Sequence, residues 1–471
     1  MRGVRFSNDS AAPFGLASLR KSNMEKITGE ITIQRDENSE IEKETKNISD
    51  FKKKIEKTFS LEATEILKIL LGGALFLRAS DIHIEPMEEK AKIRIRIDGI
   101  LQDIVFLPQK IYSLLLSRIK LLAGIKLNIA DKPQDGRFAL VLENLVVPKS
   151  SEVAGLSVKQ GLDIEIRVST LPAEYGESIV LRILNPKSLI SLEDLGLRED
   201  LLKTFEAEIK KPNGMIIVTG PTGSGKTTTL YSFLKKLQKP EIKIITIEDP
   251  IEYKLEGISQ TQVDESKGYN FANGLRSIMR QDPDVILVGE IRDFDTAQIA
   301  LQAALTGHLV LSTLHTNDAA GTISRLVDLG VSPTSIAPAL NMIVAQRLVR
   351  KVCKKCTKLT SVSREVFEKI KKGLGNLPKN LKMPALSKSL KIPQAKGCKF
   401  CNQTGYQDRI GIFETFLVDE ELEKLILSSP SISEIKEGAI KKGMTTMYQD
   451  GLIKVIEGIT TLEEVERVVA E

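Results

Sequence analysis

One glycine-rich loop constrains the fold of this chain more than any other stretch. Its residues are Gly220, Pro221, Thr222, Gly223, Ser224, Gly225, Lys226 and Thr227. The loop follows a short apolar run, residues 215–219, and precedes a stretch of helical character that begins at Thr228. A turn of this composition between a strand and a helix is typical of a phosphate-binding loop.

The residue types of the loop suit an anion. Glycine lacks a Cβ atom, so the backbone N–H groups can converge on phosphate oxygens, and the following helix adds its N-terminal dipole. We expect Lys226 to contact the β- and γ-phosphates of a nucleotide and Thr227 to bind Mg²⁺ through its hydroxyl group. The loop and Thr228 together form the predicted nucleotide-binding set.

Beyond the loop, β-type runs alternate with helical stretches. This order predicts an α/β domain with a parallel sheet that is covered by helices on both faces. The runs at residues 242–247, 285–288 and 309–314 are followed by Glu248, by Gly289 and Glu290, and by His315. Because the carboxyl ends of parallel strands meet at one edge of a sheet, these side chains are expected to share a site.

The two carboxylates at this edge predict a division of roles. We assign Glu248 to the attacking water and Glu290 to Mg²⁺ beside Thr227, since a metal site needs a carboxylate and Gly289 stands where the usual acid is found. The reverse assignment stays open. His315 is a candidate sensor of the γ-phosphate, although a lone histidine is more often structural.

Residues 57–187 are predicted to form a small α+β domain before this core. Residues 92–97 alternate between charged and apolar types, which indicates a strand with one charged face. Arginines recur on the predicted strands and turns, at Arg94, Arg96, Arg137, Arg167 and Arg182. From the pattern alone, a solvated face explains them. Residues 1–56 carry charges of both signs and are predicted to form an N-terminal arm, flexible or briefly helical, without a site.

The cysteines predict a metal site. They occur as two Cys-x-x-Cys pairs, Cys353 with Cys356 and Cys398 with Cys401. This spacing favours a structural Zn²⁺ held by four thiolates, within an insert at residues 350–408. A redox dithiol is the alternative. The lysines in and beside the insert suit either a solvated face or contact with acidic lipid head groups.

Composition excludes several classes of protein. The 471 residues carry a net charge of +5, tryptophan is absent and aromatic residues make up 5%. These values disfavour direct binding of nucleic acid. No apolar run reaches the roughly 18 residues that span a bilayer, and Pro13 spoils the N-terminus as a signal peptide. We expect a cytoplasmic protein that meets a membrane only through partners.

Four motifs, in order, resemble those of secretion ATPases of the GspE/PilB type, which serve type II secretion and type IV pilus assembly. They are the phosphate-binding loop through Tyr231, an Asp box at residues 247–252, a Walker B region at residues 280–293 and a His box at residues 306–317. The match runs from about residue 60 to the end of the chain. The tetracysteine insert resembles that of the secretion and pilus-extension branches.

The resemblance implies a homo-hexameric ring of RecA-like ATPase domains, each preceded by a PAS-like domain. In this chain the RecA-like domain would be residues 188–471, which include the zinc insert and the C-terminal helices. ATP with Mg²⁺ would lie between the two domains. Its hydrolysis would drive pseudopilus assembly, with peripheral attachment to platform proteins of the inner membrane. Pilus extension and, more remotely, DNA uptake are alternative tasks.

The resemblance also gives the arginines expected roles. By position, Arg167 and Arg182 match the family's catalytic arginines, one of which stabilises the transferring phosphate, and Arg276 and Arg280 match others near the nucleotide. The family's first N-terminal domain is missing or reduced to about 55 polar residues, which leaves the docking partner open.

Two other functions fit parts of this pattern. RecA-like rings also serve helicases, for which salt-dependent binding of DNA is the discriminating test. A scaffold that binds ATP without hydrolysing it would show no steady release of phosphate. The pairing of Glu248 with Glu290 argues against such a scaffold.

Overall fold

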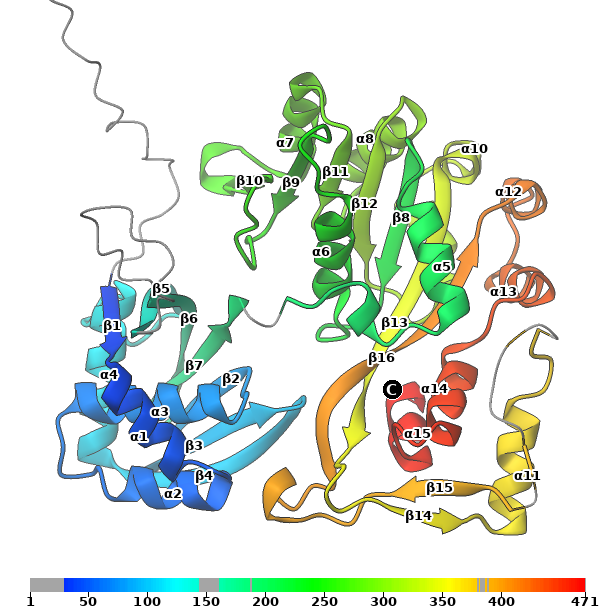
Figure 1. Cartoon of the computed structure of the whole chain (residues 1–471). Coiled ribbons are helices and arrows are strands. Elements are labelled where there is room, and N and C mark those ends of the chain that lie inside the picture. Colours follow the sequence, from blue (N-terminus) through cyan, green and yellow to red (C-terminus); the bar gives the residue numbers. More distant parts are fainter. Residues whose placement is uncertain are drawn as a thin grey trace, which may run out of the picture.

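The computed structural model describes residues 29–143, 161–186, 189–378 and 389–470, together with residues 381 and 386–387. These residues form two domains, each built on a seven-stranded sheet (Figure 1). Residues 1–28 of the predicted N-terminal arm lie outside the described part of the chain.

The N-terminal domain has the strand order β1-β5-β6-β7-β2-β3-β4. Its elements are β1 (Gly29–Ile33), α1 (Arg35–Glu44), α2 (Ile48–Glu56), α3 (Ala63–Phe76), β2 (Asp81–Pro86), β3 (Lys90–Ile97), β4 (Ile100–Pro108), α4 (Gln109–Ala123), β5 (Gln134–Glu143), β6 (Gly161–Ala173) and β7 (Gly176–Leu184). Among these described strands, only β1 and β5 pair in parallel. In β3, Ile93 and Ile95 are buried while Arg94 and Arg96 are partly exposed, so the predicted strand with one charged face is confirmed.

The predicted arm is wrong for residues 29–56, which belong to this domain. β1 extends the sheet beside β5, and Phe51 and Ile55 of α2 are fully buried in the core. The close fit is visible at Gly73 of α3, where a Cβ atom would lie 2.1 Å from the Phe51 ring. The apolar residues of α2 are spaced for one helix face, but the surrounding lysines and acids obscured that pattern in the sequence.

The second domain has the strand order β10-β9-β11-β12-β8-β13-β16. Its first elements are α5 (Glu199–Glu208), β8 (Gly214–Thr219), α6 (Lys226–Leu237), β9 (Ile244–Glu248), β10 (Ser259–Gln262), α7 (Phe271–Ile278), β11 (Val285–Val288), α8 (Phe294–Leu305), β12 (Leu309–Leu314), α9 (Gly321–Asp328) and α10 (Pro333–Ile336). All pairings are parallel except that of β13 with β16.

Two hydrophobic cores cover the faces of this sheet. In β8, Ile217 packs with residues of α7 and α8, whereas Ile216 and Val218 pack with residues of α5 and α6. The alternation places one strand residue on each face in turn, as a sheet buried on both sides requires. The predicted α/β core with a parallel sheet is therefore confirmed.

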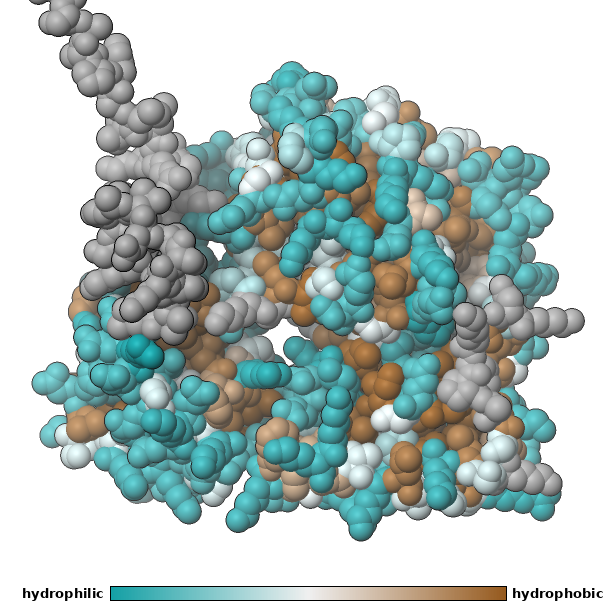
Figure 2. Space-filling model, in the orientation of Figure 1, coloured by the Kyte–Doolittle hydropathy of each residue, from teal (hydrophilic) through white to brown (hydrophobic). Residues whose placement is uncertain are grey.

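The chain ends in a region built on two long strands. β13 (Leu340–Val352) and β16 (Tyr406–Leu417) extend beyond the parallel sheet and carry β14 (Lys358–Ser361), α11 (Arg364–Gly373) and β15 (Lys391–Gln394) at their far ends (Figure 1). The C-terminal helices are α12 (Glu420–Leu427), α13 (Ile432–Lys441), α14 (Met447–Ile456) and α15 (Leu462–Ala470). In the view of Figure 2, hydrophilic residues cover most of the outer edge of the molecule. None of the helices described has the length and apolar character to cross a bilayer.

Candidate active site

The phosphate-binding loop connects β8 to α6 within the parallel sheet. Its glycines adopt positive φ angles, +146° at Gly220, +80° at Gly223 and +91° at Gly225. A Cβ atom on Gly220 would lie 2.4 Å from the backbone oxygen of Gln346, so this position requires glycine. The ammonium group of Lys226 donates a hydrogen bond to the Gly220 carbonyl oxygen at 2.7 Å, which holds it against the loop.

A cavity of about 760 Å³ lies in front of the loop, between the two domains. Ten of the predicted site residues line it: Thr222, Gly223, Gly225, Lys226, Thr227, Thr228, Arg182, Glu248, Glu290 and His315. They meet because β8, β9, β11 and β12 run in parallel and end at this edge of the sheet. The volume falls within the range of about 300–1,000 Å³ that is common for small-molecule sites.

Glu248 ends β9 and is almost fully buried at the wall of this cavity. Its Oε1 accepts hydrogen bonds from the Thr246 hydroxyl at 2.6 Å and the Gln260 amide at 3.2 Å, and its Oε2 accepts one from the Tyr231 hydroxyl. Burial raises the pKa of Glu248, while these donors act in the opposite direction. A carboxylate with a raised pKa that is held at both oxygens suits a general base.

Glu290 follows β11 and faces two basic side chains. Its Oε1 lies 2.5 Å from Nη2 of Arg292, and its Oε2 lies 3.5 Å from Nε2 of His315. Burial and the charge of Lys226 lower the pKa of His315, so its imidazole is neutral at pH 7. The structure thus brings Glu290 and His315 together at the end of two adjacent strands.

Electrostatics at Lys226 favour an anionic ligand. Burial lowers the pKa of Lys226 to about 8, although the Glu290 carboxylate opposes the shift. A polyphosphate beside this ammonium group would stabilise its charged form and offset the cost of burial.

The two predicted arginines of the N-terminal domain occupy different places. Arg182 lines the cavity, and its Nε lies 3.0 Å from Oδ1 of Asp81 while 55% of its side chain is exposed. Arg167 does not line the cavity. Its Nη1 lies 3.0 Å from Oε2 of Glu252, and its Nη2 donates to the backbone oxygen of Ile251 at 2.5 Å, so it joins the two domains.

The two predicted arginines of the second domain lie apart from the cavity. Arg276 is on α7 and donates to the Asn273 side chain at 3.1 Å. Arg280 follows α7 and donates to the backbone oxygen of Arg276 at 3.0 Å. Neither side chain reaches the nucleotide cavity of its own chain.

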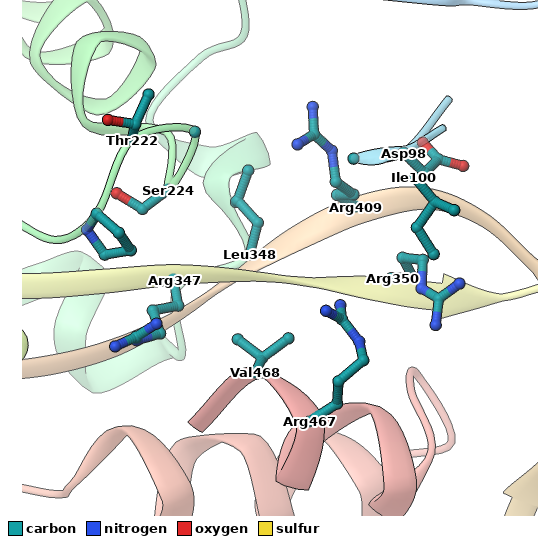
Figure 3. A pocket seen from close by; sticks show the side chains of 13 residues that line it. Asp98, Ile100, Thr222, Ser224, Arg347, Leu348, Arg350, Arg409, Arg467 and Val468 are labelled. Atoms are coloured by element: carbon teal, nitrogen blue, oxygen red, sulfur yellow. The ribbon is translucent and has the colours of Figure 1, made fainter. Parts of the chain in front are cut away.

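The far side of the loop borders a second, smaller cavity of about 140 Å³ (Figure 3). Pro221 and Ser224 line this cavity rather than the large one, whereas Thr222 and Gly223 line both. The two cavities adjoin, since Gly99, Leu348 and Arg409 also line both of them.

The four cysteines form one cluster. The Sγ atoms of Cys353, Cys356, Cys398 and Cys401 all lie within 4.8 Å of one another. The Sγ–Sγ distance is 4.0 Å between Cys353 and Cys398, 3.8 Å between Cys356 and Cys401, and 3.7 Å between Cys398 and Cys401. Zn–S bonds of about 2.3 Å in a tetrahedron separate the sulfur atoms by about 3.8 Å. The donor set and its spacing therefore fit Zn²⁺ held by four thiolates.

Sequence reasoning missed the residues that hold Glu248. From the sequence, Tyr231 is only the last residue of the phosphate-binding motif, and Thr246 and Gln260 have no expected role. Thr246 is two residues before Glu248 on the same strand face, a signal that the period of a strand could have provided. The contacts of Tyr231 and Gln260 depend on how separate elements pack, which the sequence does not display.

Known proteins are similar to this chain over most of its length. Type II secretion system protein E of Xanthomonas campestris is 44% identical over 406 residues, which cover 86% of this chain and 66% of that protein. The type IV pilus assembly ATPase TfpB of Acinetobacter baylyi is 45% identical over 394 residues, which cover 83% of this chain and 63% of that protein. This chain thus spans about two thirds of the length of these relatives.

Solved structures show the same fold. The pilus retraction motor PilT with bound ADP gives a TM-score of 0.55 at 27% identity, covering 86% of this chain and 96% of that one. The ATPase DotB of Legionella pneumophila gives a TM-score of 0.59 at 23% identity, covering 85% of this chain and 94% of that one. The family described as Type II/IV secretion system protein matches residues 62–467, and the chain belongs to this family.

Proposed function

We propose that this chain hydrolyses ATP with Mg²⁺ and that hydrolysis drives pseudopilus assembly in type II protein secretion. One observation carries the proposal: Lys226, Glu248, Glu290 and His315 converge on a single cavity at the phosphate-binding loop. A site that only stored a nucleotide would need the loop but not two carboxylates at the γ-phosphate end.

Each side chain of the site has a separate role in hydrolysis. The loop N–H groups and Lys226 bind the phosphates. Thr227 and Glu290 would hold Mg²⁺, which would supply positive charge to the phosphates. Glu248, fixed by three donors, orients a water molecule and accepts its proton as it attacks. His315, neutral and beside Glu290, registers the presence of the γ-phosphate.

The arginines complete the site in an assembled ring. Arg182 already lines the cavity and stabilises the transferring phosphate, and Arg167 controls how closely the two domains approach. Arg276 and Arg280, which do not line the cavity of their own chain, are available to a neighbouring subunit of a homo-hexamer. The cysteine cluster holds structural Zn²⁺ and fixes the region at the far ends of β13 and β16.

The direct test is steady-state release of phosphate from ATP. Lys226→Ala should abolish it, because the side chain that neutralises the β- and γ-phosphates is lost. Lys235→Ala, an exposed lysine on the same helix, is the matched control and should hydrolyse ATP normally. Hydrolysis by Lys226→Ala at the control's rate would exclude the proposed site.

Type IV pilus extension is the second candidate. Relatives bearing that name are as similar as those named for secretion: TfpB is 45% identical, and PilB of Thermus thermophilus is 43% identical over 407 residues. The membrane partners separate the two tasks. Gentle solubilisation of inner membranes with the intact chain, followed by mass spectrometry, should recover platform proteins of a secretion system. Recovery of pilus platform proteins alone would reassign the task.

A further inference from the structure

We propose that Asp81 is a positioning residue, which aims the guanidinium groups of Arg182 and Arg96 at the phosphates of the bound nucleotide. The three residues stand side by side on adjacent strands, because Asp81 of β2 pairs with Arg96 of β3 on one side and with Arg182 of β7 on the other. All three line the nucleotide cavity. The inference rests on the proposed ATPase function and adds Asp81 and Arg96 to its site.

This row of three lies on the face of the N-terminal sheet that is turned away from the core. The next residues on the same strands, Ile82, Ile95 and Leu181, are fully buried in the core that α3 and α4 complete on the other face. Because side chains alternate along a strand, the row points to the opposite side. On that side the second domain contributes the phosphate-binding loop to the cavity.

Asp81 is the most firmly held member of the row. Only 6% of the residue is exposed, although it lies on the cavity side of the sheet. Its Oδ1 accepts a hydrogen bond from Nε of Arg182 at 3.0 Å, and its Oδ2 accepts one from the Ser80 hydroxyl at 2.8 Å. Nε of Arg96 lies 3.5 Å from the same Oδ2. A fixed carboxylate between two arginines restricts where each guanidinium group can lie, which is what a pre-organised site requires.

Both arginines face Asp81 with Nε. Within the described part of the chain, the side chain of Arg182 makes its hydrogen bond through Nε, so both Nη atoms can meet a ligand. Arg96 is also held by Nη1, which donates to the backbone oxygen of Gly99 at 2.9 Å. A guanidinium group that is bound at Nε still presents terminal N–H groups, and these match phosphate oxygens.

The charge of the row explains why two arginines are present. Arg182 with Asp81 alone would be a neutral pair, whereas Arg96 gives the row one positive charge in excess. An excess positive charge in a partly enclosed site attracts a polyphosphate more strongly than a neutral pair does. A solvated face would not need to enclose a carboxylate between the two arginines.

Steady-state hydrolysis by the assembled ring tests the role of Asp81. Asp81→Asn should lower kcat about tenfold or more, because no charged group then holds Arg182 at Nε. Arg182→Lys should also lower kcat, since one ammonium group cannot pair with Asp81 and contact phosphate together. Adding Asp81→Asn to Arg182→Lys should raise kcat several-fold by releasing the lysine. A residue that only stabilised the fold would lower kcat in both backgrounds, and that result would overturn the proposal.

Two further variants secure this comparison. Asp103→Asn is the matched control, because Asp103 is an exposed residue of β4 that pairs with Lys92 outside the cavity, and it should leave kcat unchanged. In a chain that carries Arg96→Met, Asp81→Asn leaves the row with its original net charge. Repeating the comparison there decides the role of Asp81 even if Asp81→Asn alone does not fold.

Binding of a fluorescent ATP analogue tests Arg96 without relying on hydrolysis. Arg96→Met should weaken binding about tenfold, as expected for the loss of a hydrogen bond to a charged group, and should raise the KM for ATP more than it lowers kcat. Arg94→Met is the control, because Arg94 lies on the same face of β3 but pairs with Glu85 outside the cavity. Equal binding by the two variants would overturn the proposed contact.

Failure of the proposed function would give a different result. The unaltered ring would then release no phosphate, or Lys226→Ala would hydrolyse ATP at the rate of its control. In an active ring that depends on Lys226, a normal kcat for Asp81→Asn would overturn the role of Asp81 alone.

Discussion

The phenolic hydroxyl of Tyr231 donates a hydrogen bond to Oε2 of Glu248. Tyr231 lies on α6, the helix that begins at Lys226, so one helix carries both the phosphate-binding ammonium group and a donor to the proposed base. Burial and the charge of Glu248 raise the pKa of Tyr231, which therefore stays protonated and continues to donate. A shift of α6 on binding nucleotide would reach Glu248 directly.

Tyr231→Phe should move the acid limb of the pH–rate profile to higher pH. Burial already raises the pKa of Glu248, and the lost hydrogen bond stabilised its charged form, so the pKa rises further. A hydrogen bond to a charged group contributes about 1.5 kcal/mol, so its loss should raise the pKa of Glu248 by about one unit. At a pH below the new pKa, kcat should then be roughly tenfold lower than in the unaltered chain. The KM for ATP should change little, because Tyr231 makes no proposed contact with phosphate.

The control for this change is Tyr269→Phe, which removes a phenol that is hydrogen-bonded to Thr261 instead. Its pH–rate profile should coincide with that of the unaltered chain. An unshifted profile for Tyr231→Phe would show that Glu248 is not the group whose ionisation limits the rate, and would favour the reverse assignment of the two carboxylates.

From the sequence, the residues that stand at the ends of the strands are easier to predict than the contacts between separate elements. The loop glycines, Glu248, Glu290 and His315 follow apolar runs, and parallel pairing then dictates that they meet. Two of the three donors to Glu248 are not predictable in this way, since Tyr231 comes from α6 and Gln260 from β10. The buried α2 was also missed, because its apolar face is interleaved with lysines.

Glu290→Gln should retain nucleotide and lose hydrolysis. The amide keeps the size of the side chain but removes the charge that is proposed to hold Mg²⁺ and that pairs with Arg292. We expect turnover to fall by at least about a hundredfold, in line with the loss of a metal-holding or proton-transferring carboxylate. Binding of a fluorescent ATP analogue, measured beside phosphate release, separates the two effects.

Glu256→Gln is the matched control for that experiment, because Glu256 is exposed on the loop after β9 and does not line the cavity. It should bind and hydrolyse ATP normally. Turnover by Glu290→Gln within a few-fold of this control would remove Glu290 from the proposed mechanism.

Removal of metal should destabilise the region around the cysteine cluster. Metal analysis of protein purified under reducing conditions should find about one zinc per chain, and Cys398→Ser should abolish it, because three thiolates and a hydroxyl bind Zn²⁺ poorly. Chelation should lower the melting temperature by roughly 5–10 °C, and added Zn²⁺ should restore it. A reduced protein without zinc, whose thiols form disulfides on mild oxidation, would support the redox dithiol instead.

Arg182→Ala should abolish hydrolysis only in assembled rings. Arg182 lines the cavity of its own chain, but Asp81 holds it there and more than half of its side chain is exposed, so we expect it to reach a transferring phosphate only when a neighbouring chain is in place. An arginine that stabilises the transferring phosphate contributes about three powers of ten or more in rate. Turnover should therefore fall about a thousandfold in the oligomer fraction and stay at its low basal value in monomers.

Arg35→Ala, on the exposed first turn of α1, should have no effect in either fraction. Mixing Arg182→Ala chains with Lys226→Ala chains sharpens the test, because each inactive chain supplies what the other lacks. Recovery of activity in mixed oligomers is expected. No recovery, or equal loss of activity in monomers, would show that Arg182 acts in the cavity that it lines in its own chain.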